Sequence, residues 1–192
     1  MQIYDIILKY NQHWSEFEMR IFLTLFAALS LVLLICMICK KINFVQALAT
    51  LGLYIFLVIV AEATIFSRPE GGYYGYEPEL FWSWKLAAEG NRKYLEYIVL
   101  NIALLVPVGV LLPFIFNHRF ALWKSMIIGF LISLSIETTQ LRLKRGIFEW
   151  DDILHNTIGC ILGTLVINII WFICEKIWKL IKKRKEKKKE KI

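Results

Sequence analysis

Five apolar runs constrain this chain more than any other feature of its sequence. The hydrocarbon core of a bilayer is about 30 Å thick and a helix rises about 1.5 Å per residue, so about 20 apolar residues are needed to cross it. The runs cover residues 19–39, 44–66, 97–116, 123–141 and 153–174. A soluble helix keeps a polar face, yet residues 23–39 are apolar all round. The sequence therefore predicts an all-α, polytopic integral membrane helix bundle with five transmembrane helices in contact with the lipid bilayer.

Composition and charge support this prediction and exclude two other classes. Hydrophobic residues make up 58% of the 192 residues, against roughly 45–50% apolar content in soluble domains, which excludes disorder for most of the chain. The net charge of +7 belongs to residues 175–192, where ten Lys and Arg stand against three acids. Because the remainder is balanced, no folded basic face is expected and a nucleic-acid partner is excluded.

The runs divide the chain into four expected parts. Residues 1–18 are predicted to form an amphipathic segment lying on the outer membrane surface. Residues 19–174 form the transmembrane domain. Within it, the aromatic loop 67–96 is expected to be a cap or re-entrant segment at the outer interface, with a plain aromatic belt as the alternative. Residues 175–192 are the basic tail.

The distribution of Lys and Arg predicts the orientation in the membrane. Short loops rich in these residues stay in the cytoplasm. Lys40 and Lys41 lie between the first two runs, Arg119 and Lys124 between the third and fourth, and ten more cations lie in 175–192. Five crossings place all three groups on one side. The amino terminus is then outside and the carboxyl terminus cytoplasmic.

Polar residues inside apolar spans are the candidate functional residues, because a charge at the bilayer centre costs from about 2.5 kcal/mol upward. Glu137 and Gln140 are three apart and share a helix face, and Asp152 and Asn156 begin a stripe that continues through glycines. The predicted topology gathers the set toward the outer leaflet. The alternative is an interhelical polar network that only fixes the bundle. The expected cluster comprises Arg68, Asn101, Glu137, Gln140, Arg145, Asp151, Asp152 and Asn156.

The cysteines do not predict a metal site. Cys36 and Cys39 have C-x-x-C spacing, but no second pair follows and no strand precedes them, so zinc-site and thioredoxin readings both fail. We expect them to pack as small apolar side chains. No metal ligand is predicted, and the sequence leaves open whether a cofactor is used.

The order of these polar residues resembles a known family. The order begins with Asn101, Pro107 and Gly109, continues with Glu137-x-x-Gln140 and with Arg145 and Asp151-Asp152, and ends with Asn156-x-x-Gly159-x-x-x-Gly163. In carrying these residues in this order, the chain is similar to the VanZ-like family of bacterial membrane proteins. The resemblance implies a multi-pass protein of the bacterial cell membrane and envelope, related to one that lowers sensitivity to the glycopeptide teicoplanin. It implies no catalytic residues.

Three functions remain open at this point. An outward-facing cluster could recognise an anionic lipid or a lipid-linked cell-wall precursor, with Arg68 and Arg145 binding its phosphates. The chain could instead be an enzyme on a lipid head group, in which Glu137, Asp151 and Asp152 supply acid and base and Mg²⁺ or Ca²⁺ suits the oxygen ligands; this hypothesis lacks an evident nucleophile. The third possibility is a non-enzymatic scaffold partner of an envelope complex.

Overall fold

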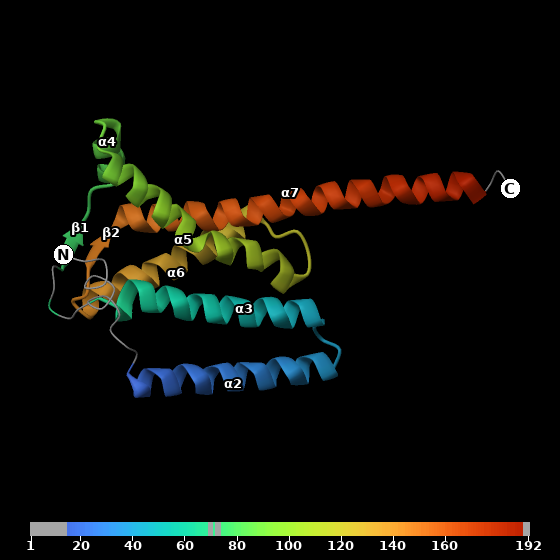
Figure 1. Cartoon of the computed structure of the whole chain (residues 1–192), viewed down its shortest axis with the longest axis horizontal. Helices are drawn as coiled ribbons and strands as arrows, with labels where there is room; N and C mark the ends of the chain where they lie inside the picture. The colour runs from blue at the N-terminus through green and yellow to red at the C-terminus, as the bar shows by residue number, and fades with distance from the viewer. Residues whose placement is uncertain (1–14, 69–70, 72–73, 190–192) are drawn as a thin grey trace, which may run out of the picture.

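The computed structural model describes residues 15–68, 71 and 74–189, and five long helices dominate it (Figure 1). All five are long and apolar enough to cross a membrane. The predicted all-α, multi-pass membrane bundle is confirmed. Residues 1–14 of the expected amphipathic segment lie outside the described residues. The elements are α2 (Glu16–Ile38), α3 (Phe44–Ala61), η1 (Glu62–Phe66), β1 (Gly75–Glu77), α4 (Trp82–Ala88), α5 (Arg92–Phe116), α6 (Leu122–Arg142), β2 (Ile147–Glu149) and α7 (Trp150–Lys189).

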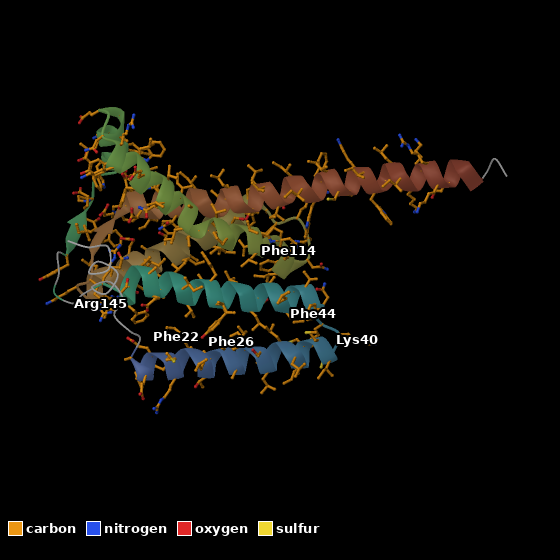
Figure 2. The ribbon with its side chains drawn as sticks, viewed as in Figure 1. Phe22, Phe26, Lys40, Phe44, Phe114 and Arg145 are labelled. Carbon is orange, nitrogen blue, oxygen red and sulfur yellow. The ribbon has the colours of Figure 1, made fainter. Side chains whose placement is uncertain are left out.

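The bundle has two unlike ends. We call the end that carries β1, β2 and α4 the capped end, and the opposite end, where α7 runs past its neighbours, the tail end (Figure 1). Arg145 lies at the capped end and Lys40 at the tail end (Figure 2). Helix α7 has 40 residues, or about 60 Å of helix, which is about twice the thickness of the hydrocarbon core. The basic residues after Glu175 therefore continue α7 as a helix, as the good helix propensity of Lys, Arg and Glu favours.

Helices α5 and α7 pack backbone against backbone because three glycines face the interface. A Cβ built on Gly159 would lie 1.8 Å from the carbonyl oxygen of Ile102, and one on Gly109 would lie 1.9 Å from that of Cys160. Gly163 also has no room for a side chain, because a Cβ built on it would lie 2.2 Å from the carbonyl oxygen of Val106. Small residues allow such close approach between membrane helices. Any side chain at these positions would push the two helices apart.

The buried hydroxyl of Thr164 replaces the backbone hydrogen bond that Pro113 removes from α5. Proline has no N–H, so the carbonyl of Gly109 loses its helical donor. The hydroxyl of Thr164 on α7 donates to this oxygen at 2.9 Å, and Ser125 of α6 donates to Thr164 at 2.7 Å. One polar chain thereby links α6, α7 and α5 inside the bundle, where free backbone groups must find protein partners.

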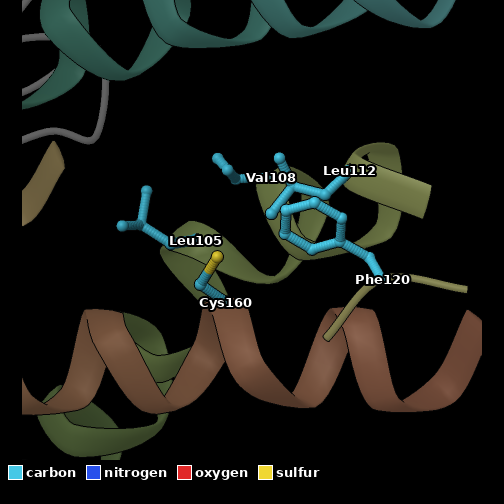
Figure 3. Packing of buried hydrophobic residues seen from close by; sticks show 5 residues of the cluster. All are labelled: Leu105, Val108, Leu112, Phe120 and Cys160. Atoms are coloured by element: carbon cyan, nitrogen blue, oxygen red, sulfur yellow. The ribbon is translucent and has the colours of Figure 1, made fainter. Parts of the chain in front are cut away.

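The apolar core lies beside this interface and toward the tail end. Figure 3 shows its five central side chains, which come from α5, from α7 and from the α5–α6 connection. They are Leu105, Val108, Leu112, Phe120 and Cys160. Leu53, Phe56 and Leu57 of α3 and Ile128 and Ile132 of α6 pack around them. The core therefore belongs to α3, α5, α6 and α7.

Helix α2 stands at the edge of the bundle and contributes no buried residue. Phe22 and Phe26 extend from it toward α3 (Figure 2). The hydroxyl of Tyr54 on α3 donates to the carbonyl oxygen of Phe22 at 2.7 Å, and the rings of Phe26 and Tyr54 lie 5.8 Å apart. The rings of Phe22 and Phe66 also lie 6.1 Å apart. Because no residue of α2 is buried, most of its surface is left for lipid.

Candidate functional site

Two short strands tie the aromatic segment to the start of α7. β1 and β2 pair in parallel, with Tyr76 opposite Phe148 in register. The rings of these two residues stack with centroids 5.3 Å apart, and the indole N–H of Trp150 donates to the hydroxyl of Tyr76 at 2.9 Å. Segments more than 70 residues apart thus meet at the capped end.

Asp151 anchors α4 to α7. Its carboxylate is fully buried and accepts from the backbone N–H of Phe81 at 2.5 Å and of Ser83 at 3.1 Å. It also accepts from the hydroxyl of Ser83 at 2.6 Å. These bonds satisfy the first free amides of α4, as a capping side chain would. They also hold Phe81 at a φ of 64°, a left-handed conformation that is unusual for a bulky residue.

His155, one turn after Asp151, holds the same segment through Trp84. Its Nε2 accepts from the indole N–H of Trp84 at 2.6 Å, and its ring is fully buried. Ser83, Asp151 and His155 are the residue types of a hydrolase triad, but the triad needs the serine bonded to the histidine. Here the Ser83 hydroxyl donates to Asp151. The arrangement positions the aromatic segment and does not activate a serine.

A second group of polar side chains, which we call the carboxylate cluster, consists of Tyr97, Asn101, Glu137, Glu149 and Asp152. The side-chain amide of Asn101 donates to Asp152 at 2.7 Å. The hydroxyl oxygen of Tyr97 lies 2.5 Å from a carboxyl oxygen of Asp152 and 2.9 Å from one of Glu149. Tyrosine has one hydroxyl hydrogen, so these two carboxyl groups compete for a single donor.

Glu137 forms the buried side of the cluster. Its side chain accepts from the backbone N–H of Glu149 at 3.1 Å, and the residue is only 2% exposed. Glu149 itself is half-buried; burial raises its pKa and the charges of Asp151 and Glu77 add to the rise, while the Tyr97 hydrogen bond and the charge of Arg68 oppose it. An oxygen-rich, acidic environment thus surrounds Tyr97.

Arg68 supplies positive charge to this cluster. It interacts electrostatically with Glu137, Glu149 and Asp152. Its guanidinium also lies next to Gly146, where a Cβ would be 2.6 Å from one of its nitrogens. Arg68 is exposed, so its guanidinium is accessible as well as close to the carboxylates.

Gln140 and Arg145 lie against the end of α3, and the side-chain oxygen of Gln140 is next to Gly146, as the guanidinium of Arg68 is. At the end of α3 the helix widens into η1, and the side-chain amide of Gln140 donates to the carbonyl oxygen of Thr64 at 3.0 Å. Arg145 donates to the carbonyl oxygens of Ile65 at 3.3 Å and Phe66 at 3.5 Å. These side chains satisfy carbonyls at the helix end. The guanidinium of Arg145 is thus directed at the main chain.

Asn156 lies one turn below Asp152. Its amide nitrogen donates to the hydroxyl of Ser133 at 2.8 Å, and both residues are buried. Of the eight residues expected from the sequence, the structure brings together Asn101, Glu137 and Asp152. Arg68 interacts electrostatically with Glu137 and Asp152, and Asn156 lies one helical turn after Asp152. The structure turns Asp151 toward α4, and Gln140 and Arg145 toward η1.

Sequence reasoning missed Tyr97 and Glu149 as members of the cluster. Tyr97 stood at the start of a predicted span, where an interfacial aromatic residue is ordinary. Its position three residues after Tyr94 and four before Asn101 puts it on the helix face of Asn101, which is the signal that could have found it. Among the described residues, no group of three His, Cys, Asp or Glu side chains is arranged to hold a metal ion.

Comparison with known proteins bears on the region that holds this cluster. A family model described as VanZ/LLP1 matches residues 52–172, more than half of the chain. The match runs from α3 into α7 and includes the carboxylate cluster and the segment of β1 and α4 (residues 74–91), which we call the cap. It leaves out α2 and the basic end of α7. No curated protein and no solved structure matches the chain.

Proposed function

The chain belongs to the VanZ/LLP1 family, and on that premise we propose that its carboxylate cluster binds the head group of a lipid-linked component of the bacterial cell envelope. The resemblance carried by residues 101–163 is confirmed by the family match. The observation that supports the proposal most is the setting of Asp152. Its carboxylate accepts from Asn101, shares the Tyr97 hydroxyl with Glu149, and is only partly buried near the exposed Arg68.

The groups in the cluster indicate what such a head group carries. Carboxylates and the carbonyl of an asparagine amide accept hydrogen bonds from hydroxyl, amide or amine groups, which are abundant in sugars and peptides. Phosphate suits the forked guanidinium of an arginine. Because Arg145 is directed at backbone carbonyls, Arg68 is the phosphate ligand that we propose. It would also separate the phosphate from the acidic side chains.

A binding measurement tests this proposal. We would reconstitute the protein in lipid nanodiscs and titrate a polyprenyl-phosphate-linked disaccharide-peptide precursor, following bound ligand by native mass spectrometry. We expect Arg68→Gln and Asp152→Asn each to weaken binding at least tenfold. Lys85→Gln is the matched control, because Lys85 is an exposed cation at the same end that pairs with Glu79. Equal binding by Arg68→Gln and the wild type would refute the proposal. Teicoplanin susceptibility of cells carrying the same variants gives a second readout.

The proposed binding face is the outer one. Lys40, Lys41, Arg119 and Lys124 lie at or next to the connections of the tail end, together with the basic part of α7, which supports a cytoplasmic tail end and an outer capped end. Single cysteines at Glu89 and Lys185, in a chain without its four native cysteines, test this orientation. We expect an impermeant maleimide to label Glu89→Cys in intact cells. Labelling of Lys185→Cys instead would invert the topology.

Catalysis at the same cluster is the second candidate, because two carboxyl groups crowd around the Tyr97 hydroxyl and the Glu137 carboxyl lies next to them. Crowded carboxyls can exchange protons with a bound head group. Comparing the lipids of cells that carry the wild type or Glu137→Gln would decide between binding alone and chemistry. A changed lipid species would support an enzyme, and identical profiles would contradict it.

A further inference from the structure

A lateral groove runs between α6 and α7 on the membrane-spanning part of the bundle. Its volume is about 410 Å³, and it is lined by Met126 and Phe130 of α6 and by Leu154 of α7, among others. Leu80 and Trp150 line it as well. It is separate from the carboxylate cluster, because Asp152 faces Tyr97 and Asn101 of α5.

The groove offers no free hydrogen-bonding side chain. Thr157 is the polar residue in its lining, and the Thr157 hydroxyl donates back to the carbonyl oxygen of Ile153 at 2.6 Å. Trp150 directs its indole N–H to the hydroxyl of Tyr76 at 2.9 Å, so that it presents only carbon to the groove. A ligand that needs hydrogen bonds would find none here. Hydrocarbon is the chemistry that fits.

One part of the groove wall is fixed by the cap. Leu80 immediately precedes Phe81, whose backbone N–H is held at 2.5 Å by the buried Asp151. Leu80 is therefore placed by a firmly bonded turn rather than by a free loop. The groove is thus partly preformed. Its lining residues Met126, Ile127 and Leu131 are also exposed on α6, so the groove opens on the surface of a helix that is apolar enough to cross a membrane.

From these observations we propose that the groove holds one acyl chain of a membrane glycerolipid, retained between α6 and α7 and against the cap. The acyl chain fills the space between the apolar side chains of α6 and α7 that line the groove, and it contacts Leu80 and Trp150. The proposal does not depend on head-group binding at the carboxylate cluster.

Photo-crosslinking tests the proposal. The protein is placed in nanodiscs containing phosphatidylglycerol with a diazirine near the middle of one acyl chain, and adducts are mapped by mass spectrometry after illumination. We expect adducts to concentrate on Phe130 and Leu154. Leu154→Trp should fill the groove and lower the Phe130 adduct at least fivefold. Val166→Trp is the matched control, because Val166 lies on α7 and is 51% exposed outside the groove lining, and it should leave the adduct unchanged.

Two outcomes would overturn the proposal. Equal adduct density on Leu154 and Val166 in the wild type would indicate the ordinary lipid shell only. Crosslinks to a second protein chain in place of lipid would indicate a protein partner in the groove. If Leu154→Trp fails to give monodisperse protein, Ile127→Trp, at another lining position on α6, provides the same comparison.

Discussion

Helices α2 and α7 are both long and apolar, yet they relate to the bundle in opposite ways. α7 contacts the backbone of α5 at Gly159 and Gly163, and its Thr164 hydroxyl donates to a backbone carbonyl of α5. It also provides Asp151, which binds the cap through Ser83. α2 buries no residue and contacts its neighbours through aromatic side chains such as its own Phe26 and Tyr54 of α3. In a membrane both helices are stable as separate spans, because lipid covers apolar side chains as well as protein does. Hydrophobicity therefore inserts a helix, while small and polar residues decide which helices assemble.

The largest expected effect breaks the α5–α7 contact. Gly159→Ala places a Cβ in collision with the carbonyl of Ile102, and backbone cannot yield as a flexible side chain would. We expect a loss of about 4 kcal/mol or more in the free energy of unfolding, seen as aggregated protein after detergent extraction. Gly52→Ala on α3 is the control, since its nearest neighbour would be 4.0 Å away. Comparable yields of folded protein from both variants would contradict the packing.

A pair of leucine substitutions then compares the core with α2 directly. Leu105 on α5 is 0% exposed and Leu31 on α2 is 58% exposed. Leu105→Ala should cost about 2–3 kcal/mol through the cavity it leaves, and Leu31→Ala should change the free energy of unfolding by less than about 0.5 kcal/mol. Unfolding in mixed micelles measures both. Similar losses would show that α2 is packed as tightly as α5.

The attachment of the cap to α7 is the next test. Asp151→Asn keeps the shape but removes the charge that accepts three hydrogen bonds from Phe81 and Ser83. Hydrogen bonds to a charged group contribute about 1.5–3 kcal/mol, so we expect a comparable local loss. Limited proteolysis should cut residues 74–91 faster while leaving the long helices intact. Glu79→Gln, at an exposed ion pair, should show no such change.

The smallest expected effect concerns pH. Burial raises the pKa of Glu149 above its usual 4.5, so the folded protein binds this proton more tightly than the unfolded chain. This contribution to stability is fully present below about pH 4.5 and is lost as pH rises through the folded value. Thermal midpoints between pH 4 and 8 should therefore fall less steeply for Glu149→Gln than for the wild type. Exposed Glu89→Gln should follow the wild type, and parallel curves for all three would contradict the assignment.

The spans were predictable because length and hydropathy decide them, and all five are present. The helices extend beyond the predicted spans: α5 begins at Arg92, before the span expected from Tyr97, and α7 continues to Lys189. Charged residues that end an apolar run still favour helix. The polar set shows a similar division. Helical spacing places Asp152, Gly159 and Gly163 on one side of α7. It could not show that Asp151 bonds to Ser83 or Glu149 approaches Tyr97, since segments far apart in sequence meet only through tertiary packing.

The position of α7 after α5 and α6 in the sequence has a consequence for biosynthesis. The ribosome completes α5 and α6 before their shared partner exists, so Asn101, Glu137 and Gly109 enter the bilayer with their α7 contacts still unmade. A nascent chain at this stage exposes polar groups and an uncovered glycine face to lipid. Release of α7 from the insertion machinery closes these surfaces in one step. A chain truncated before Asp152 would keep them open and offer membrane proteases a recognisable substrate.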